Sequence, residues 1–118
     1  MPLTLDFKID SIGAKNGWMK CWLVVDEELH QILATSVFPP FGDVLSFIYV
    51  IASDALPYEF FWEEEGHGAK FRASQSVQGS DYIHVYINHD DEVVVDTNFK
   101  RKTIVQSFFD ALRSFALD

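Results

Sequence analysis

The sequence predicts an α+β fold: a two-layer sandwich in which a mostly antiparallel sheet of about six to seven strands carries two helices on one face. Three observations lead to this prediction. Apolar and polar residues alternate along several short segments, as they do in half-buried strands. Short turn sequences join these segments, which favours antiparallel neighbours, and two longer segments have the apolar spacing of helices. With both helices on one face, the other face of the sheet is expected to be partly or wholly exposed.

The length and composition fit one domain. The chain has 118 residues, of which 48% are hydrophobic and 15% aromatic, with eleven Phe and three Trp. This composition supplies enough apolar surface for one core and is far from that of disordered chains. We therefore expect a single domain over residues 1–118.

Three strands are predicted in the first third of the chain, because apolar and polar residues alternate there between turn sequences. They cover residues 3–9, 17–26 and 28–36, with turns at Asn16-Gly17 and at 26–28 and an end at Pro39-Pro40. The second strand has two distinct faces. One carries Met19, Cys21, Leu23 and Val25, and the other carries Trp18, Lys20, Trp22 and Val24.

Residues 41–56 are predicted to form a helix, with Asp43 as its cap and Pro57 beyond its end. Tyr49 and Val50 make this segment apolar nearly all round, so deep packing is expected. A buried strand is the alternative, but the apolar run is long for one.

A hairpin and a further strand pair are predicted next. Residues 58–63 and 70–74 alternate, and Gly66 and Gly68 flank His67 at the turn between them. Strands over 81–89 and 92–97 follow, joined by a polar corner.

An amphipathic helix is expected to end the chain. Its start lies either near 98 or near 103, because Lys100-Arg101-Lys102 opposes the helix dipole while Thr103 and Gln106 match a capping box. Its apolar stripe consists of Ile104, Val105, Phe108, Phe109, Leu112, Phe115 and Ala116.

The charge is strongly one-sided. The formal net charge is −9, and residues 21–69 contain nine acids and no Lys or Arg. Such a field repels nucleic acid and anionic membranes and favours cationic partners, although solubility alone is the alternative explanation. The start of the chain lacks a basic then apolar signal pattern, and the apolar run at 44–52 is short for a membrane span, so we expect a cytoplasmic protein with no nucleic-acid or membrane partner.

The segment FFWEEEGHGAKF at 60–71 raises the question of a metal or acid–base site. Glu63, Glu65 and His67 could gather around the turn, but no second histidine lies nearby, and HExxH and CxxC are absent. His84 and His89 are five residues apart, so on one continuous strand they point to opposite faces. We therefore expect a solvated hairpin tip with no metal and no cofactor.

Catalysis is not predicted either. An acid–base pair needs a carboxyl whose pKa is raised by burial, whereas three adjacent Glu at a turn are expected to be wet. Cys21 lies among apolar residues, where a free thiol acts as a small hydrophobe. The sequence lacks GxSxG, GxGxxG and P-loop motifs. An enzyme with a site assembled from distant residues stays as an alternative.

The expected functional feature is a binding surface opposite the core. Aromatic rings interleaved with charge on one face are typical of protein interfaces. If the register of a strand is reversed, some of these rings belong to the core instead. The predicted partner-binding residues are Trp18, Trp22, Glu59, Phe61, Glu63, Glu64, Glu65, His67, Tyr82, His84 and Tyr86.

Four segments carry a resemblance to a known class: Gly17-Trp18 at the second strand, FGDVLSFIYVIA, WEEEGHGAKFR and the Phe-rich last helix. Together with the acidic α+β pattern, the chain resembles the immunity proteins of bacterial toxin–immunity systems, particularly those of contact-dependent growth inhibition. The resemblance implies a cytosolic inhibitor that binds one cognate, basic toxin domain, often a nuclease, and blocks its active site or substrate access. A small adaptor or chaperone-like binding protein is the alternative from another class.

Overall fold

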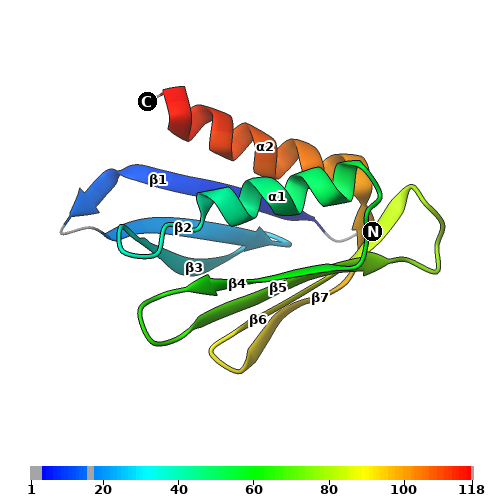
Figure 1. Ribbon diagram of the computed structural model, residues 1–118, viewed down its shortest axis with the longest axis horizontal. Coiled ribbons are helices and arrows are strands. Elements are labelled where there is room, and N and C mark those ends of the chain that lie inside the picture. The colour runs from blue at the N-terminus through cyan, green and yellow to red at the C-terminus, as the bar shows by residue number, and fades with distance from the viewer. Residues whose placement is uncertain (1–3, 16–17, 118) are drawn as a thin grey trace.

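The computed structural model describes residues 4–15 and 18–117 and shows an α+β chain (Figure 1). Its first half contains β1 (Leu5–Lys15), β2 (Trp18–Val25), β3 (Glu28–Thr35) and α1 (Phe41–Ala52). Its second half contains β4 (Tyr58–Glu63), β5 (Gly68–Gln75), β6 (Tyr82–His89), β7 (Glu92–Lys100) and α2 (Arg101–Leu117). The predicted turn at Asn16-Gly17 lies outside the described residues.

The strands form two antiparallel sheets. The order is β1-β2-β3 in one sheet and β4-β5-β6-β7 in the other. The predicted antiparallel pairing, the number of strands and the two helices are confirmed, but the prediction of one sheet was wrong. The chain passes through α1 between β3 and β4, and these two strands share no ladder.

Side chains, rather than a backbone ladder, cover the free edge of β3. The amide of Leu33 donates to Oε2 of Glu64 over 2.8 Å, and its carbonyl accepts from Nε1 of Trp62 over 2.9 Å. These bonds satisfy the backbone groups that an unpaired edge would otherwise present to another chain. The two sheets are therefore joined at this point by residues of β4 and of the turn that follows it.

One continuous core lies between the sheets and the helices. Both helices lie on the same side of the strands, with α2 along β1 and α1 beside α2 (Figure 1). The ring of Phe47 on α1 packs against Phe60, Phe71 and Phe108 at centroid distances of 5.4 to 6.0 Å. Trp62 is fully buried. Burial of large rings such as these contributes strongly to the favourable free energy of folding.

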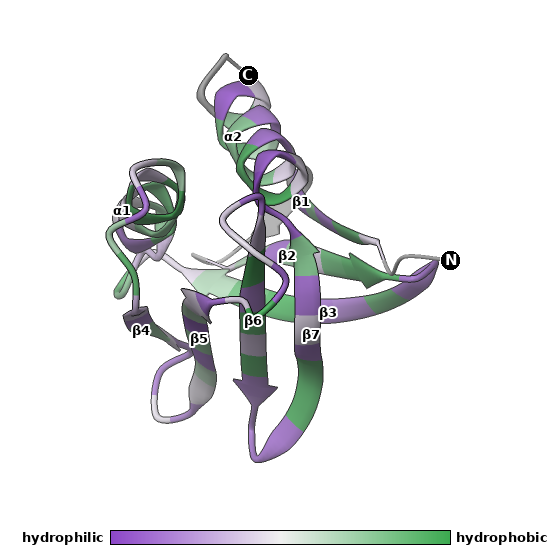
Figure 2. Ribbon diagram, turned by 90° about the vertical axis from the view of Figure 1, so that its right-hand side faces the viewer, coloured by the Kyte–Doolittle hydropathy of each residue, from purple (hydrophilic) through white to green (hydrophobic). Residues whose placement is uncertain are grey.

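The strand faces predicted from alternation are confirmed. Cys21 and Leu23 of β2 point into the core, as do Ile83, Val85 and Ile87 of β6. Hydropathy alternates visibly in bands along β6 (Figure 2). The rings of Tyr82 and Tyr86 are therefore on the opposite, half-buried side.

The first helix differs from its prediction in two ways. Pro40 takes the N-cap position and Asp43 lies in the first turn, so the prediction that Asp43 caps the helix was wrong. Leu45 is 54% exposed and Tyr49 is 71% exposed, so the helix is packed on one side only. It ends at Ala52, before the predicted limit at residue 56.

The last helix begins at Arg101, between the two predicted starts. A base in the first turn opposes the helix dipole, but Arg101 is paired. Its guanidinium donates to Oδ1 of Asp54 over 2.9 Å and to the carbonyl oxygen of Ile51. Neither helix in the described part of the chain is long and apolar enough to cross a membrane.

Candidate functional site

The structure separates the predicted partner-binding residues into three places. Trp18 and Trp22 are half-buried on the three-stranded sheet, away from the rest of the set in the fold. Glu59, Phe61, Tyr82, His84 and Tyr86 lie on the outer face of the four-stranded sheet, and Glu63, Glu64, Glu65 and His67 lie at the β4–β5 turn. The prediction of one continuous face was therefore wrong, because it assumed one sheet.

The outer face of the four-stranded sheet is mixed in charge. Glu59, Arg72, Tyr86 and Asp96 pair in register and form one row across all four strands. The neighbouring row contains Phe61, Lys70, Asn88 and Val93. The two rows together hold two acids and two bases, so the negative excess of the chain lies elsewhere.

The negative excess gathers at the two turns at one end of this sheet. Residues 61–69 and 86–99 contain no Lys or Arg. The acids of these turns and their flanks are Glu63, Glu64, Glu65, Asp90, Asp91 and Glu92. Phe61 and Val93 stand at the edge of this region and are 50% and 52% exposed.

A shallow hollow of about 340 Å³ opens between the turns and the outer face. Phe61 and Tyr86 provide its aromatic walls, and Lys70 provides an ammonium group. It is also lined by His67, Gly68, Asn88, Asp90 and Asp91. The hollow thus joins exposed rings to the acidic turns.

The backbone of the β4–β5 turn explains where each Glu points. Glu65 and Gly66 have φ of 61° and 108°, which reverses the chain within two residues. Glu63 closes the turn by accepting from the amide of Gly66 over 2.6 Å. Glu65 accepts from the Thr35 hydroxyl over 2.6 Å. Glu64, between them, points inward and is only 3% exposed, so the prediction of three wet carboxylates was wrong for this residue.

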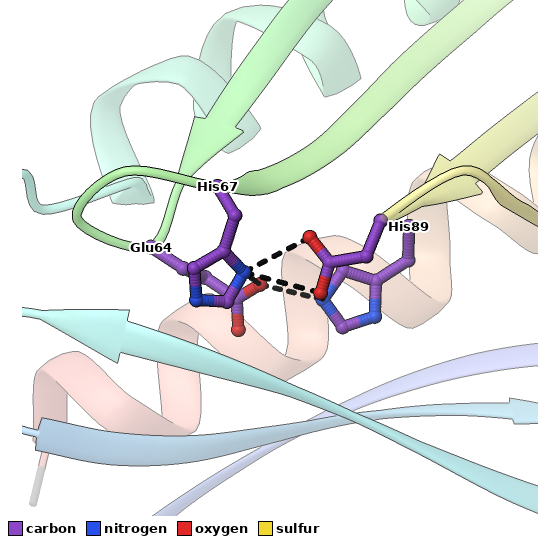
Figure 3. Close-up of side chains that lie close together, drawn as sticks. Glu64, His67 and His89 are labelled. Atoms are coloured by element: carbon purple, nitrogen blue, oxygen red, sulfur yellow. Dashed lines mark hydrogen bonds and ion pairs between the residues drawn. The ribbon is translucent and has the colours of Figure 1, made fainter.

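Glu64 belongs to a cluster with His67, His89 and Asp90, in which the labelled side chains point toward one another (Figure 3). Its Oε1 lies 2.5 Å from Nε2 of His89 and 3.5 Å from Nδ1 of His67. Nδ1 of His67 lies 2.9 Å from Oδ1 of Asp90. On the inner side, Nδ1 of His89 lies 2.9 Å from Nε2 of His30 on β3.

His89 is the second histidine that the sequence pattern did not supply. It follows His67 by 22 residues, and only the antiparallel pairing of β5 with β6, in which Ala69 faces His89, brings the two turns together. The polar corner predicted at residues 89–91 is the signal that the sequence offers. It marked a turn but could not identify the turn beside it.

The electrostatics of the cluster follow from these contacts. The hydrogen bond to Asp90 raises the pKa of His67, and nearby acids raise it further. Burial lowers the pKa of His30, and the positive charge available on His89 lowers it as well. The pKa values of the two histidines thus shift in opposite directions, because His67 is hydrogen-bonded to a carboxylate whereas His30 is partly removed from solvent and also faces another imidazole.

Cys21 is not part of any reactive arrangement. It is fully buried in the core, and burial raises the pKa of its thiol to about 12. A thiol in this state is a poor nucleophile at neutral pH.

Comparisons with protein-family models, with curated proteins and with solved structures gave no match. The site is therefore interpreted from its own geometry.

Proposed function

We propose that this protein is a cytoplasmic immunity protein, which binds one cognate toxin domain with a basic surface and blocks its active site or its access to substrate. The observation that carries the proposal is the group of acids around exposed rings at the β4–β5 and β6–β7 turns. We call this region the tip surface, and it consists of Phe61, Glu63, Glu65, His67, Tyr86, Asp90, Asp91, Glu92 and Val93.

The tip surface has the two components that a specific interface needs. Phe61 and Val93 are apolar and exposed and stand at the two ends of one cross-strand row, so a partner can bury them as two separate anchors. The acids around them provide a rim that attracts a basic partner and disfavours wrong ones. A nuclease cleft is a partner of this kind, because it is built to attract phosphate groups.

The tip surface replaces the wider face predicted from the sequence. Trp18 and Trp22 are on the other sheet, and the bases Lys70 and Arg72 neutralise much of the outer face. An interface of ordinary size buries about 800 Å² on each partner. The tip surface would form its centre, with part of the outer face at its rim.

The test begins with a pull-down from the native organism at low ionic strength, using the full chain as bait. The captured protein is then expressed in a growth assay with and without this chain. We expect one basic domain that stops growth alone and becomes harmless when the chain is present. Capture of many unrelated proteins would instead support an adaptor, and a captured partner whose toxicity is unaffected would contradict the proposal.

A further inference from the structure

We propose that Glu64, His67, His89 and Asp90 bind a zinc ion, which fastens the β4–β5 turn to the β6–β7 turn. The proposal rests on the geometry of the cluster and does not depend on the proposed immunity function. These four residues each offer one ligand atom, and the four atoms lie within 4.8 Å of one another. The donor set is two imidazole nitrogens and two carboxylate oxygens, all of which are zinc ligands.

The spacing of the ligand atoms is close to that of a tetrahedral site. Zinc bonds of about 2.0 to 2.1 Å place tetrahedral ligands about 3.3 Å apart. Oε1 of Glu64 and Nδ1 of His67 are 3.5 Å apart, and Nε2 of His89 and Oδ2 of Asp90 are 3.6 Å apart. The pairs joined by hydrogen bonds are closer, at 2.5 Å for Oε1 of Glu64 with Nε2 of His89 and 3.1 Å for Nδ1 of His67 with Oδ2 of Asp90. To bind an ion in place of the shared protons, the two atoms of each hydrogen-bonded pair need to move apart by less than 1 Å.

A second layer of contacts already holds the ligands in place. Oε2 of Glu64 accepts from the Leu33 amide, which leaves Oε1 directed at the cluster. Oδ1 of Asp90 accepts from the Gly68 amide over 3.2 Å. With Nε2 of His89 on the metal, its Nδ1 carries the proton and donates to Nε2 of His30, 2.9 Å away. Metal-binding histidines and carboxylates usually have such outer partners, which orient them.

Burial and charge also fit a bound dication. Glu64 and the side chain of His89 are 3% and 12% exposed, whereas His67 and Asp90 are 56% and 45% exposed. The ion would thus reach the cluster from solvent on the side of His67 and Asp90 and be held from inside by the other two ligands. Two carboxylates together neutralise a 2+ ion, and their ion pairs in the structure are with histidines rather than with Lys or Arg.

The chemistry of the ligands favours zinc over the hard cations. Calcium and magnesium prefer oxygen ligands throughout, whereas imidazole suits zinc and its transition-metal neighbours. Four protein ligands complete the tetrahedron and leave no position for a reacting water. We therefore assign a structural role to the ion, namely the joining of the two turns.

The test measures zinc binding to the full-length chain after treatment with a chelator. Competition with a chromophoric chelator gives the affinity, and metal analysis after dialysis gives the stoichiometry. We expect one zinc per chain and a higher melting temperature with zinc. His67→Ala and Asp90→Ala, both at exposed positions, should weaken binding at least about tenfold. Cobalt in place of zinc should give the intense visible absorption of a tetrahedral site.

His84→Ala is the matched control. His84 is also a histidine of the four-stranded sheet beside a carboxylate, with its Nε2 2.7 Å from Asp96, but it is outside the cluster. Its substitution should leave zinc affinity unchanged. The proposal is overturned if wild type binds no zinc, if His67→Ala binds it as tightly as wild type, or if His84→Ala weakens binding as much as His67→Ala does.

Discussion

The carboxylate of Glu64 links segments that are far apart in the sequence. One oxygen accepts from Leu33 on β3, and the other lies beside His89 at the end of β6. The residue is almost fully buried, and a buried polar group costs free energy unless its partners are present. Glu64 is therefore a structural residue of the tip. Of its neighbours, Glu63 closes the local turn and Glu65 accepts from the Thr35 hydroxyl on β3.

Glu64→Ala should destabilise the protein by about 2 to 3 kcal/mol, because the Leu33 amide and His89 both lose a buried partner. Denaturant unfolding in the presence of a chelator measures the effect without any contribution from metal. Glu63→Ala is the control, since it removes one hydrogen bond, to the exposed amide of Gly66, and should cost at most about 1 kcal/mol. Equal effects from the two variants would contradict the structural role of Glu64.

The burial of the Cys21 thiol predicts that the protein loses stability in alkaline solution. Burial raises the pKa of its thiol from an ordinary value of 9.0 to about 12 in the folded chain. The folded state therefore holds this proton more tightly than the unfolded state does. The resulting stabilisation is complete below pH 9 and is lost as the pH rises from 9 toward 12.

Denaturant unfolding across this pH range, compared between wild type and Cys21→Ala, isolates the contribution of the thiol. The wild-type free energy of unfolding should fall more steeply with pH than that of the variant. Parallel curves would show that the thiol has the same pKa in the folded and unfolded states. That result would contradict the effect expected from the burial of Cys21.

The hairpin formed by β4 and β5 depends on a glycine that the turn itself does not require. A Cβ built on Gly68 would lie 1.9 Å from the carbonyl oxygen of Trp62. Backbone cannot move aside as a flexible side chain can, so β4 and β5 would have to separate at the point where Trp62 fills the core. Gly68 is thus needed for close approach between strands.

Gly68→Ala should therefore destabilise the fold by at least about 2 kcal/mol, as measured by thermal or denaturant unfolding. Gly42→Ala is the matched control. Gly42 lies in the first turn of α1 with no atom within 4 Å of a built Cβ, so alanine there should stabilise by about 0.4 to 1 kcal/mol. A neutral effect of Gly68→Ala would mean that the strands can separate without loss.

The sequence could predict the strands and their faces because alternation is a local property. Alternation alone places Phe61 on the outer face of its strand, and Tyr82 and Tyr86 on the outer face of theirs, whatever lies beside either strand. The division into two sheets depends instead on what β3 meets at its free edge. That edge is covered by the side chains of Trp62 and Glu64, from about 30 residues further along the chain. The cluster around His89 was beyond prediction for the same reason, since it forms only where two separate turns meet.

Across the whole protein, charge and apolar anchors are distributed unevenly. The helix side carries exposed Leu45, Tyr49 and Phe109, while the acids concentrate at the tips of the four-stranded sheet. A partner with a basic surface would therefore be steered toward the tips before any close contact forms. Steering acts mainly on the association rate, whereas buried anchors act mainly on dissociation.

This asymmetry predicts how the captured partner responds to charge reversal. Glu65→Lys combined with Glu92→Lys changes the net charge from −9 to −5, since each substitution adds two charges. Both positions are exposed and lie on different turns of the tip surface. The association rate measured by stopped flow at low salt should fall by about tenfold or more, and its dependence on salt should weaken. The dissociation rate should change much less.

Asp81→Lys combined with Asp110→Lys makes the same change in net charge at exposed positions away from the tips, one before β6 and one on α2. If local charge at the tip surface steers the partner, this control should retain most of the wild-type association rate. If only the total charge matters, the association rate should fall equally for the two double variants. The tip surface would then not be the docking site. Because Glu64 is left intact in both variants, unfolding measurements should show that neither result comes from loss of the fold.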